Sequence, residues 1–231
     1  MPLLRSRWLV AHVVALIAVI AFVMLGFWQL RRLDERRTFN NAVSVALEAE
    51  PIPIAGAPAE GYVRVTVAGT FDTSVETLTL RSFEGTSGYH VLTPLVLGDG
   101  TGVLVDRGWV PISYDTPPVG GPAAAPTGEV LVTGILWPAE HQAIPETLPG
   151  TLRAIAPEVV GAFTPYPMRD SYLVLQTADP APSELPIPPA PPELSDGPHL
   201  GYAVQWFLFA GVVIVGYPIL LRRVARTKKI W

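Results

Sequence analysis

The chain has 231 residues, a formal net charge of −4 and no cysteine. The absence of cysteine excludes disulfides, thiolate metal sites and a cysteine nucleophile. Charged residues make up only 16% of the chain and hydrophobic residues 49%, a composition that predicts membrane-embedded segments.

Two apolar runs are long enough to cross a membrane. The first predicted transmembrane helix covers residues 8–30 and the second covers residues 199–221. A helix rises about 1.5 Å per residue, so each run exceeds a hydrocarbon core of about 30 Å. Arg5 and Arg7 precede the first run, as in a secretory signal. However, the run is too long for a signal and lacks a small-residue cleavage pattern, so we expect an uncleaved anchor.

Charge is segregated along the chain. Residues 38–198 hold five arginines, no lysine and eighteen acidic residues, for a net charge of −13, whereas the two ends carry +9. A domain this acidic argues against nucleic acid as a partner. With residues 1–7 and 222–231 as cytoplasmic tails, seven basic residues lie inside and four outside, as the positive-inside rule favours. We therefore predict a bacterial plasma-membrane protein with two spans and both termini in the cytoplasm.

The residues between the spans predict an extracytoplasmic, antiparallel β-rich domain over residues 31–179, folded as a small barrel or sandwich. A helix is expected to continue out of the first span over residues 40–47, and Gly-Asp-Gly at 98–100 predicts a hairpin turn. A proline within the run 90–97 predicts an edge strand or a bulge there. Short apolar and alternating runs predict strands at residues 63–67, 77–81, 90–97, 102–110, 130–137 and 171–176.

Residues 180–198 contain eight prolines. Such a segment favours the polyproline II conformation, which makes it a semi-rigid linker. It is either a plain linker into the second span or a spacer and docking strip for a partner.

The start of the second span carries a histidine beside aromatic residues. At about 100° per residue, His199, Tyr202 and Trp206 share one helical face. An imidazole backed by aromatic surface at the membrane edge suits a flat, apolar, metal-bearing ligand, with His199 as the axial ligand of the metal. Tyr and Trp also favour this depth as plain interfacial anchors.

The end of the first span supplies further groups at the same outer face. Trp28 offers an indole wall, and Arg31 and Arg32 follow it three and four residues later. Haem needs an axial histidine, apolar surface and cations for its propionates, so these residues predict a haem site with His199. An aromatic belt whose arginines bind lipid phosphate requires nearly the same residues. His12 lies a membrane thickness away, and we expect it to pack against the other helix.

The run Asp106-Arg107-Gly108-Trp109 closes one predicted strand. It is either a local ion pair followed by a strand-end glycine or a partner-binding edge anchored by Arg107 and Trp109. His90 is expected in the core or at a rim. No Walker, dinucleotide-binding or His-x-x-x-His motif occurs, so the sequence predicts no enzyme.

The chain resembles the Surfeit locus protein family, also called the Shy family, of cytochrome c oxidase assembly factors. The resemblance runs in order through most of the chain. It is carried by LGFWQ at 25–29 with Arg31 or Arg32, GTF at 69–71, GYHVLTPL at 88–95, VLVDRGWVP at 103–111 and HLGYAVQW at 199–206.

The resemblance implies a non-enzymatic role in maturing the haem–copper subunit of cytochrome c oxidase. Family members bind haem a or assist its delivery, so the implied cofactor is a transiently held haem a, and His199 is the matching histidine. The implied partners are oxidase subunits, within or outside a respiratory supercomplex, besides membrane lipid. The alternative is a structural accessory subunit of such a supercomplex with no cofactor of its own.

Overall fold

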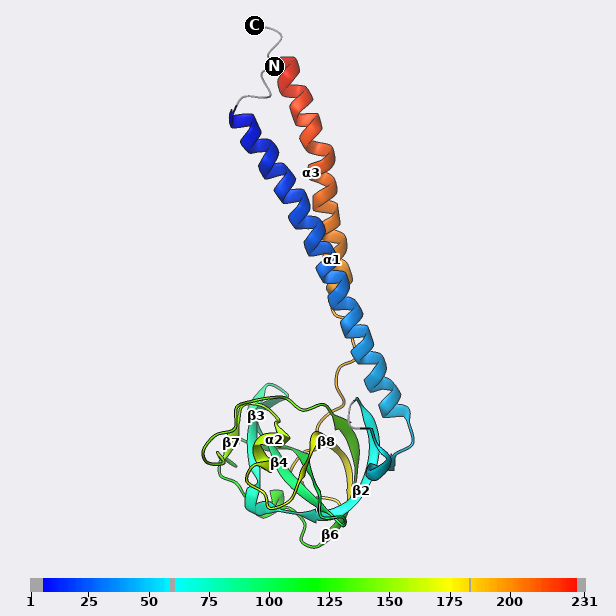
Figure 1. The fold of residues 1–231 in the computed structure, drawn as a ribbon, viewed down its shortest axis with the longest axis vertical. Coiled ribbons are helices and arrows are strands. Elements are labelled where there is room, and N and C mark those ends of the chain that lie inside the picture. Colours follow the sequence, from blue (N-terminus) through cyan, green and yellow to red (C-terminus); the bar gives the residue numbers. More distant parts are fainter. Residues whose placement is uncertain (1–5, 59–60, 183, 228–231) are drawn as a thin grey trace. The chain divides into compact units, whose positions relative to one another are not determined.

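The computed structural model describes residues 6–58, 61–182 and 184–227 (Figure 1). The chain divides into two compact units, described separately below. The helical unit comprises Met1–Asn41 and Glu193–Trp231, and the β-domain comprises Ala42–Pro192. Of the basic tail residues, Arg5, Lys228 and Lys229 lie outside the described residues.

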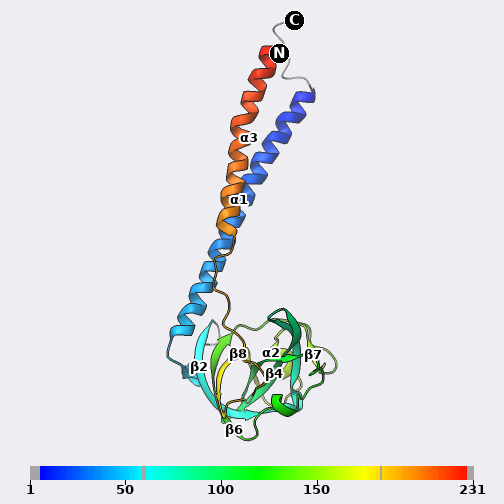
Figure 2. The same ribbon diagram turned by 180° about the vertical axis from the view of Figure 1, so that it is seen from behind.

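The helical unit pairs two long helices. Helix α1 (Ser6–Glu48) and helix α3 (His199–Thr227) lie side by side and run in opposite directions (Figures 1 and 2). Both are long and apolar enough to cross a membrane, which agrees with the prediction of a two-span membrane protein. The expected continuation of the first helix over residues 40–47 is confirmed, because α1 reaches Glu48.

Small residues form the seam between the two helices. Ala203 is 1% exposed and Ala210 is 3% exposed, although most of the α3 surface is open. A side chain on Gly26 of α1 would overlap the ring of Phe207. Because apolar burial does not drive helices together in lipid, such close approach, together with interhelical hydrogen bonds, holds the two helices together.

A polar pair joins the helices at the far end from His199. The Tyr217 hydroxyl lies 2.9 Å from Nδ1 of His12, and the two rings meet edge to face at 5.7 Å. The expectation that His12 packs against the other helix is confirmed.

The β-domain is built on one eight-stranded sheet with the order β1-β2-β6-β8-β5-β4-β3-β7. A short helix, α2 (Pro157–Gly161), precedes the last strand. The strands are β1 (Ile52–Pro53), β2 (Val63–Phe71), β3 (Thr77–Phe83), β4 (Thr86–Leu97), β5 (Gly102–Pro111), β6 (Glu129–Trp137), β7 (Thr151–Leu152) and β8 (Met168–Asp179).

The prediction of a β-rich domain between two apolar helices is confirmed, and each of the six expected strands forms. The sheet is mixed, because β5 pairs with β8 in parallel, as do the two-residue strands β1 and β7 with their neighbours. Strand β2 also pairs with β4 over three residue pairs. The sheet therefore curls back on itself at one corner without becoming a fully closed barrel.

The proline inside β4 lies between the part of the strand that pairs with β3 and the part that pairs with β2. Pairing with β3 ends at Leu92 and pairing with β2 begins at Leu95, so Pro94 sits where no strand needs its missing N–H. Its carbonyl accepts a hydrogen bond from the Asp72 amide at 2.9 Å. The expected bulge lies nearby, between His90 and Leu92.

The proline-rich segment packs against its own domain. We call residues 185–192 the strap. The Ile187 N–H donates to the Trp109 carbonyl at 2.8 Å, and the Ile187 carbonyl accepts from the Trp109 N–H at 2.7 Å. Strand β8 pairs with β5 only as far as Asp106, so the strap takes the free edge of β5 beyond that point. Gly108 makes this possible, because it has a φ of 122° and a Cβ there would overlap the Ile187 carbonyl.

Replacing Gly108 with alanine should destabilise the β-domain. Both the positive φ and the overlap with the strap penalise a side chain, so Gly108→Ala should lower the free energy of unfolding by about 1–3 kcal/mol. Chemical denaturation of the purified full chain, followed by circular dichroism, measures the change. Gly98→Ala is the matched control, because Gly98 has open space around it. Equal stability of the two variants would contradict the role given to Gly108.

Candidate functional site

The head of α3 places a histidine in a defined hydrogen bond. His199 is the first residue of the helix, and its Nδ1 lies 2.9 Å from Oε1 of Gln29 on α1. An amide oxygen only accepts, so Nδ1 donates, and in this Nδ1–H tautomer Nε2 carries the lone pair. An imidazole oriented through one nitrogen in this way is prepared to bind a metal through the other.

An open depression of about 430 Å³ borders His199. Its other lining residues lie on α1 and are Arg32, Glu35, Arg36 and Phe39. Arg32 and Glu35 form an ion pair of 2.9 Å with both side chains more than half exposed, so the pair contributes little stability. The Arg32 guanidinium also lies 5.7 Å from the ring centre of Trp28. The depression therefore combines an imidazole, cations and aromatic surface.

Two arginines of α1 hold the segment that leads into α3. Arg36 donates to the backbone carbonyls of Glu193 and Ser195 at 2.7 and 3.1 Å. Arg37 pairs with the Asp196 carboxylate at 2.8 Å. These contacts fix the chain just before the first residue of α3. They also give two of the four arginines that follow the first span a structural role.

The other predicted haem-site residues are distributed differently. Trp206 stacks on Phe22 with ring centres 5.7 Å apart, seven residues along α3 from His199. Tyr202 is half exposed. Arg31 borders a different depression, with Asp34. The structure thus brings together His199 and Arg32, with Trp28 against Arg32, and keeps Arg31 and Trp206 apart from them.

Sequence reasoning missed Gln29 as the partner of His199. The residue is part of the run that ends the first span, but its role depends on the register between the helices. An antiparallel pairing in which Phe22 faces Trp206 and His12 faces Tyr217 also sets Gln29 opposite His199. The LGFWQ motif includes Gln29, but only the register between the helices shows which residue it meets.

The run that closes β5 has internal partners. Arg107 is 2% exposed, and its guanidinium lies 3.2 Å from the Glu76 carboxylate and 2.9 Å from the Ala123 carbonyl. Burial lowers the pKa of Arg107, and the charge of Glu76 opposes that shift. The expected local pairing of Arg107 with Asp106 is wrong, because the two side chains point to opposite faces of the strand. Trp109 is 7% exposed, so neither proposed anchor presents a side chain to a partner in this structure.

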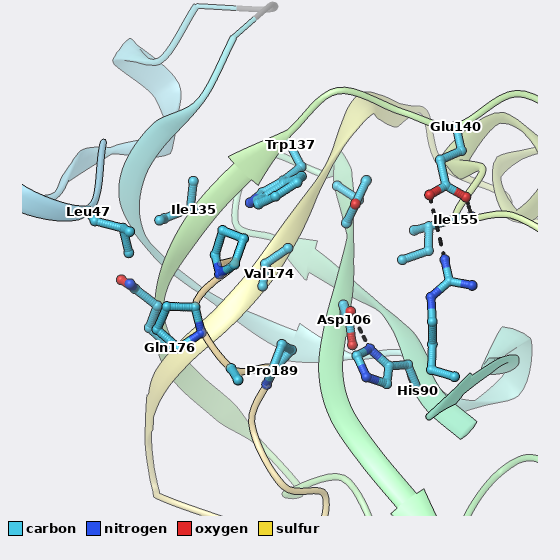
Figure 3. A pocket seen from close by; sticks show the side chains of 15 residues that line it. Leu47, His90, Asp106, Ile135, Trp137, Glu140, Ile155, Val174, Gln176 and Pro189 are labelled. Carbon is cyan, nitrogen blue, oxygen red and sulfur yellow. Dashed lines mark hydrogen bonds and ion pairs between the residues drawn. The ribbon is translucent and has the colours of Figure 1, made fainter. Parts of the chain in front are cut away.

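The β-domain also contains a pocket of about 300 Å³ (Figure 3). His90 lies at its rim, with Nδ1 2.8 Å from the carboxylate of Asp106. Glu140, which also lines the pocket, pairs with Arg81 at 3.5 Å. Burial raises the pKa of Tyr172, which also lines the pocket, and the charges of nearby carboxylates raise it further. The tyrosine therefore remains protonated well above pH 10.

The model of the SURF1 family matches residues 16–211 of the chain. The chain belongs to the SURF1 family. The match includes Gln29, His199 and the whole β-domain. The resemblance seen in the sequence motifs is thereby confirmed.

Several relatives resemble this SURF1-family chain, two of those named here over most of its length. An uncharacterized SURF1-like protein of Mycobacterium bovis is 30% identical over 93% of this chain and 83% of its own. A SURF1-like protein of Rickettsia felis is 24% identical over 92% of this chain and 97% of its own. The Surfeit locus protein 1 of Takifugu rubripes is 32% identical over 38% of this chain and 45% of its own.

Proposed function

We propose that the chain aids insertion of haem a into the haem–copper subunit of cytochrome c oxidase, as a non-enzymatic assembly factor. The SURF1 family is known in general for cytochrome c oxidase assembly, which makes oxidase subunits the natural partners. The observation that supports a role in haem a insertion is the hydrogen bond from His199 to Gln29. It leaves one imidazole nitrogen available beside cations and aromatic rings.

The residues around His199 fit the needs of haem a. Bound haem a would supply its iron as a Lewis acid for the free nitrogen of His199. Phe39 and Trp28 offer aromatic surface. Arg36 is committed to backbone carbonyls, so Arg32 is the guanidinium for a propionate. Arg32 now pairs with Glu35, but this ion pair is exposed, so a propionate could take the place of the Glu35 carboxylate with little loss of free energy. A single histidine ligand suits transient binding.

We also propose that both termini lie in the cytoplasm and the β-domain lies outside. The support is the excess of basic residues in the tails over those after the first span. Because the chain has no cysteine, a single introduced cysteine is the only thiol of the protein that a maleimide can label. A membrane-impermeant maleimide added to spheroplasts should label Asp115→Cys, and should label Arg222→Cys only after permeabilisation. The reverse pattern would refute this orientation.

Deletion of the gene should remove the haem a band from difference spectra of membranes. Wild-type protein should restore the band, and His199→Ala should restore less than about a tenth of it, because the ligand is lost. Gln29→Leu should give an intermediate level, since removing the group that orients a metal-binding histidine typically costs 10–100-fold in affinity. His141→Ala, a change at an exposed histidine of the β-domain, is the matched control.

Two outcomes of the deletion experiment would count against the haem a proposal. Full restoration by His199→Ala would refute the role of that histidine. Normal haem a spectra in the deletion strain, together with an altered size of the oxidase complex, would favour the alternative of a structural accessory subunit.

A further inference from the structure

The pocket of the β-domain has no part in the function proposed above. We propose that it is a second binding site, for a small neutral molecule with an apolar body and one head group that both donates and accepts a hydrogen bond. A phenol or a primary amide meets this description. The proposal is independent of haem a, because every residue that lines the pocket belongs to the β-domain.

The walls of the pocket are apolar and preformed. Ile135 of β6 and Val174 of β8 are cross-strand neighbours and lie with Trp137 along one side (Figure 3). The strap contributes prolines from residues 189–192. Its attachment to Trp109 and the rigidity of proline make this wall a fixed one. A volume of about 300 Å³ is at the lower end for small-molecule sites.

The charged groups in the pocket already have hydrogen-bond or ion-pair partners. Asp106 faces His90 at 2.8 Å, and Glu140 faces Arg81 at 3.5 Å. An ionic ligand would leave water for apolar walls without meeting an unpartnered group of opposite charge, because both Asp106 oxygens already accept hydrogen bonds, from His90 and from the Gly108 N–H. Its desolvation would therefore be costly. The pocket therefore favours a neutral ligand.

Two polar atoms remain for the head group. The Asp106 carboxylate accepts from Nδ1 of His90, and in the Nδ1–H tautomer that this contact selects, Nε2 is an acceptor. The hydroxyl of Tyr172 is a donor, and its residue is 6% exposed. Among the described residues it has no hydrogen-bond partner. A head group that accepts from Tyr172 and donates to His90 satisfies both residues. An apolar body attached to this head group would also contact the apolar walls, which a bound water molecule could not do.

A set of size-matched aromatic probes tests this selectivity. The full chain in lipid nanodiscs is titrated with p-cresol, toluene, benzoate and benzylammonium by saturation-transfer NMR, with empty nanodiscs subtracted. We expect saturable binding of p-cresol. Toluene lacks the head group and should bind about tenfold more weakly. Benzoate and benzylammonium should be weaker by at least the same factor.

Substitutions then locate the binding. Val174→Phe fills the pocket from β8 and Leu47→Trp narrows it from another side, so each should abolish saturable p-cresol binding. Tyr172→Phe should weaken it about tenfold. Leu131→Phe, on an exposed position of β6, is the matched control and should bind as the wild type does. Thermal unfolding of each variant identifies any that fails to fold.

Several results would overturn the proposal. They are p-cresol binding no greater than to empty nanodiscs, binding retained in both folded pocket variants, and tighter binding of either charged probe. A loss of p-cresol binding in Val174→Phe, with haem a fully restored by the same variant in the deletion strain, would support the second site and separate it from the haem a role.

Discussion

The close approach of α1 and α3 fixes the geometry of the helical unit. Lipid solvates apolar side chains as well as a neighbouring helix does, so two spans associate through packing and polar pairs. Gly26, Ala203 and Ala210 supply the packing. Their register sets Gln29 opposite His199, and the hydrogen bond between these two depends on it. A side chain at Gly26 would overlap the Phe207 ring, so that ring would have to leave its place in the seam.

The run that closes β5 shows how neighbouring residues can serve unrelated contacts. Asp106 holds His90 at the rim of the pocket, and Arg107, on the other face of the strand, neutralises Glu76 in the core. Gly108 gives the strap room, and the backbone of Trp109 pairs with it. Removing one member of a buried ion pair typically costs about 3–5 kcal/mol, so Arg107 and Glu76 depend on each other. These four residues organise the β-domain from within.

Local signals in the sequence predicted much of this architecture. Apolar length indicated both spans, and alternating side chains indicated six strands, because each signal arises from neighbouring residues. Contacts across long stretches of chain were not predictable in this way. Arg107 meets Glu76 rather than the adjacent Asp106, and β5 joins β8 in parallel. For residues 180–198 the sequence predicts only a linker or a docking strip, because nothing local to the prolines of the strap reveals the open edge beside Trp109. Likewise, the position of His199 at the start of the second span predicts a binding role, whereas its partner Gln29 follows only from the helix register.

The central claim is that His199, oriented by Gln29, offers one imidazole nitrogen to haem iron. The most direct measurement is the Soret spectrum of purified His199→Gly protein mixed with haem a, before and after addition of free imidazole. We predict that the substitution abolishes the ligand-bound spectrum of the wild type and that imidazole restores it by occupying the vacated position. A His199→Gly spectrum identical to that of the wild type without imidazole would contradict the claim.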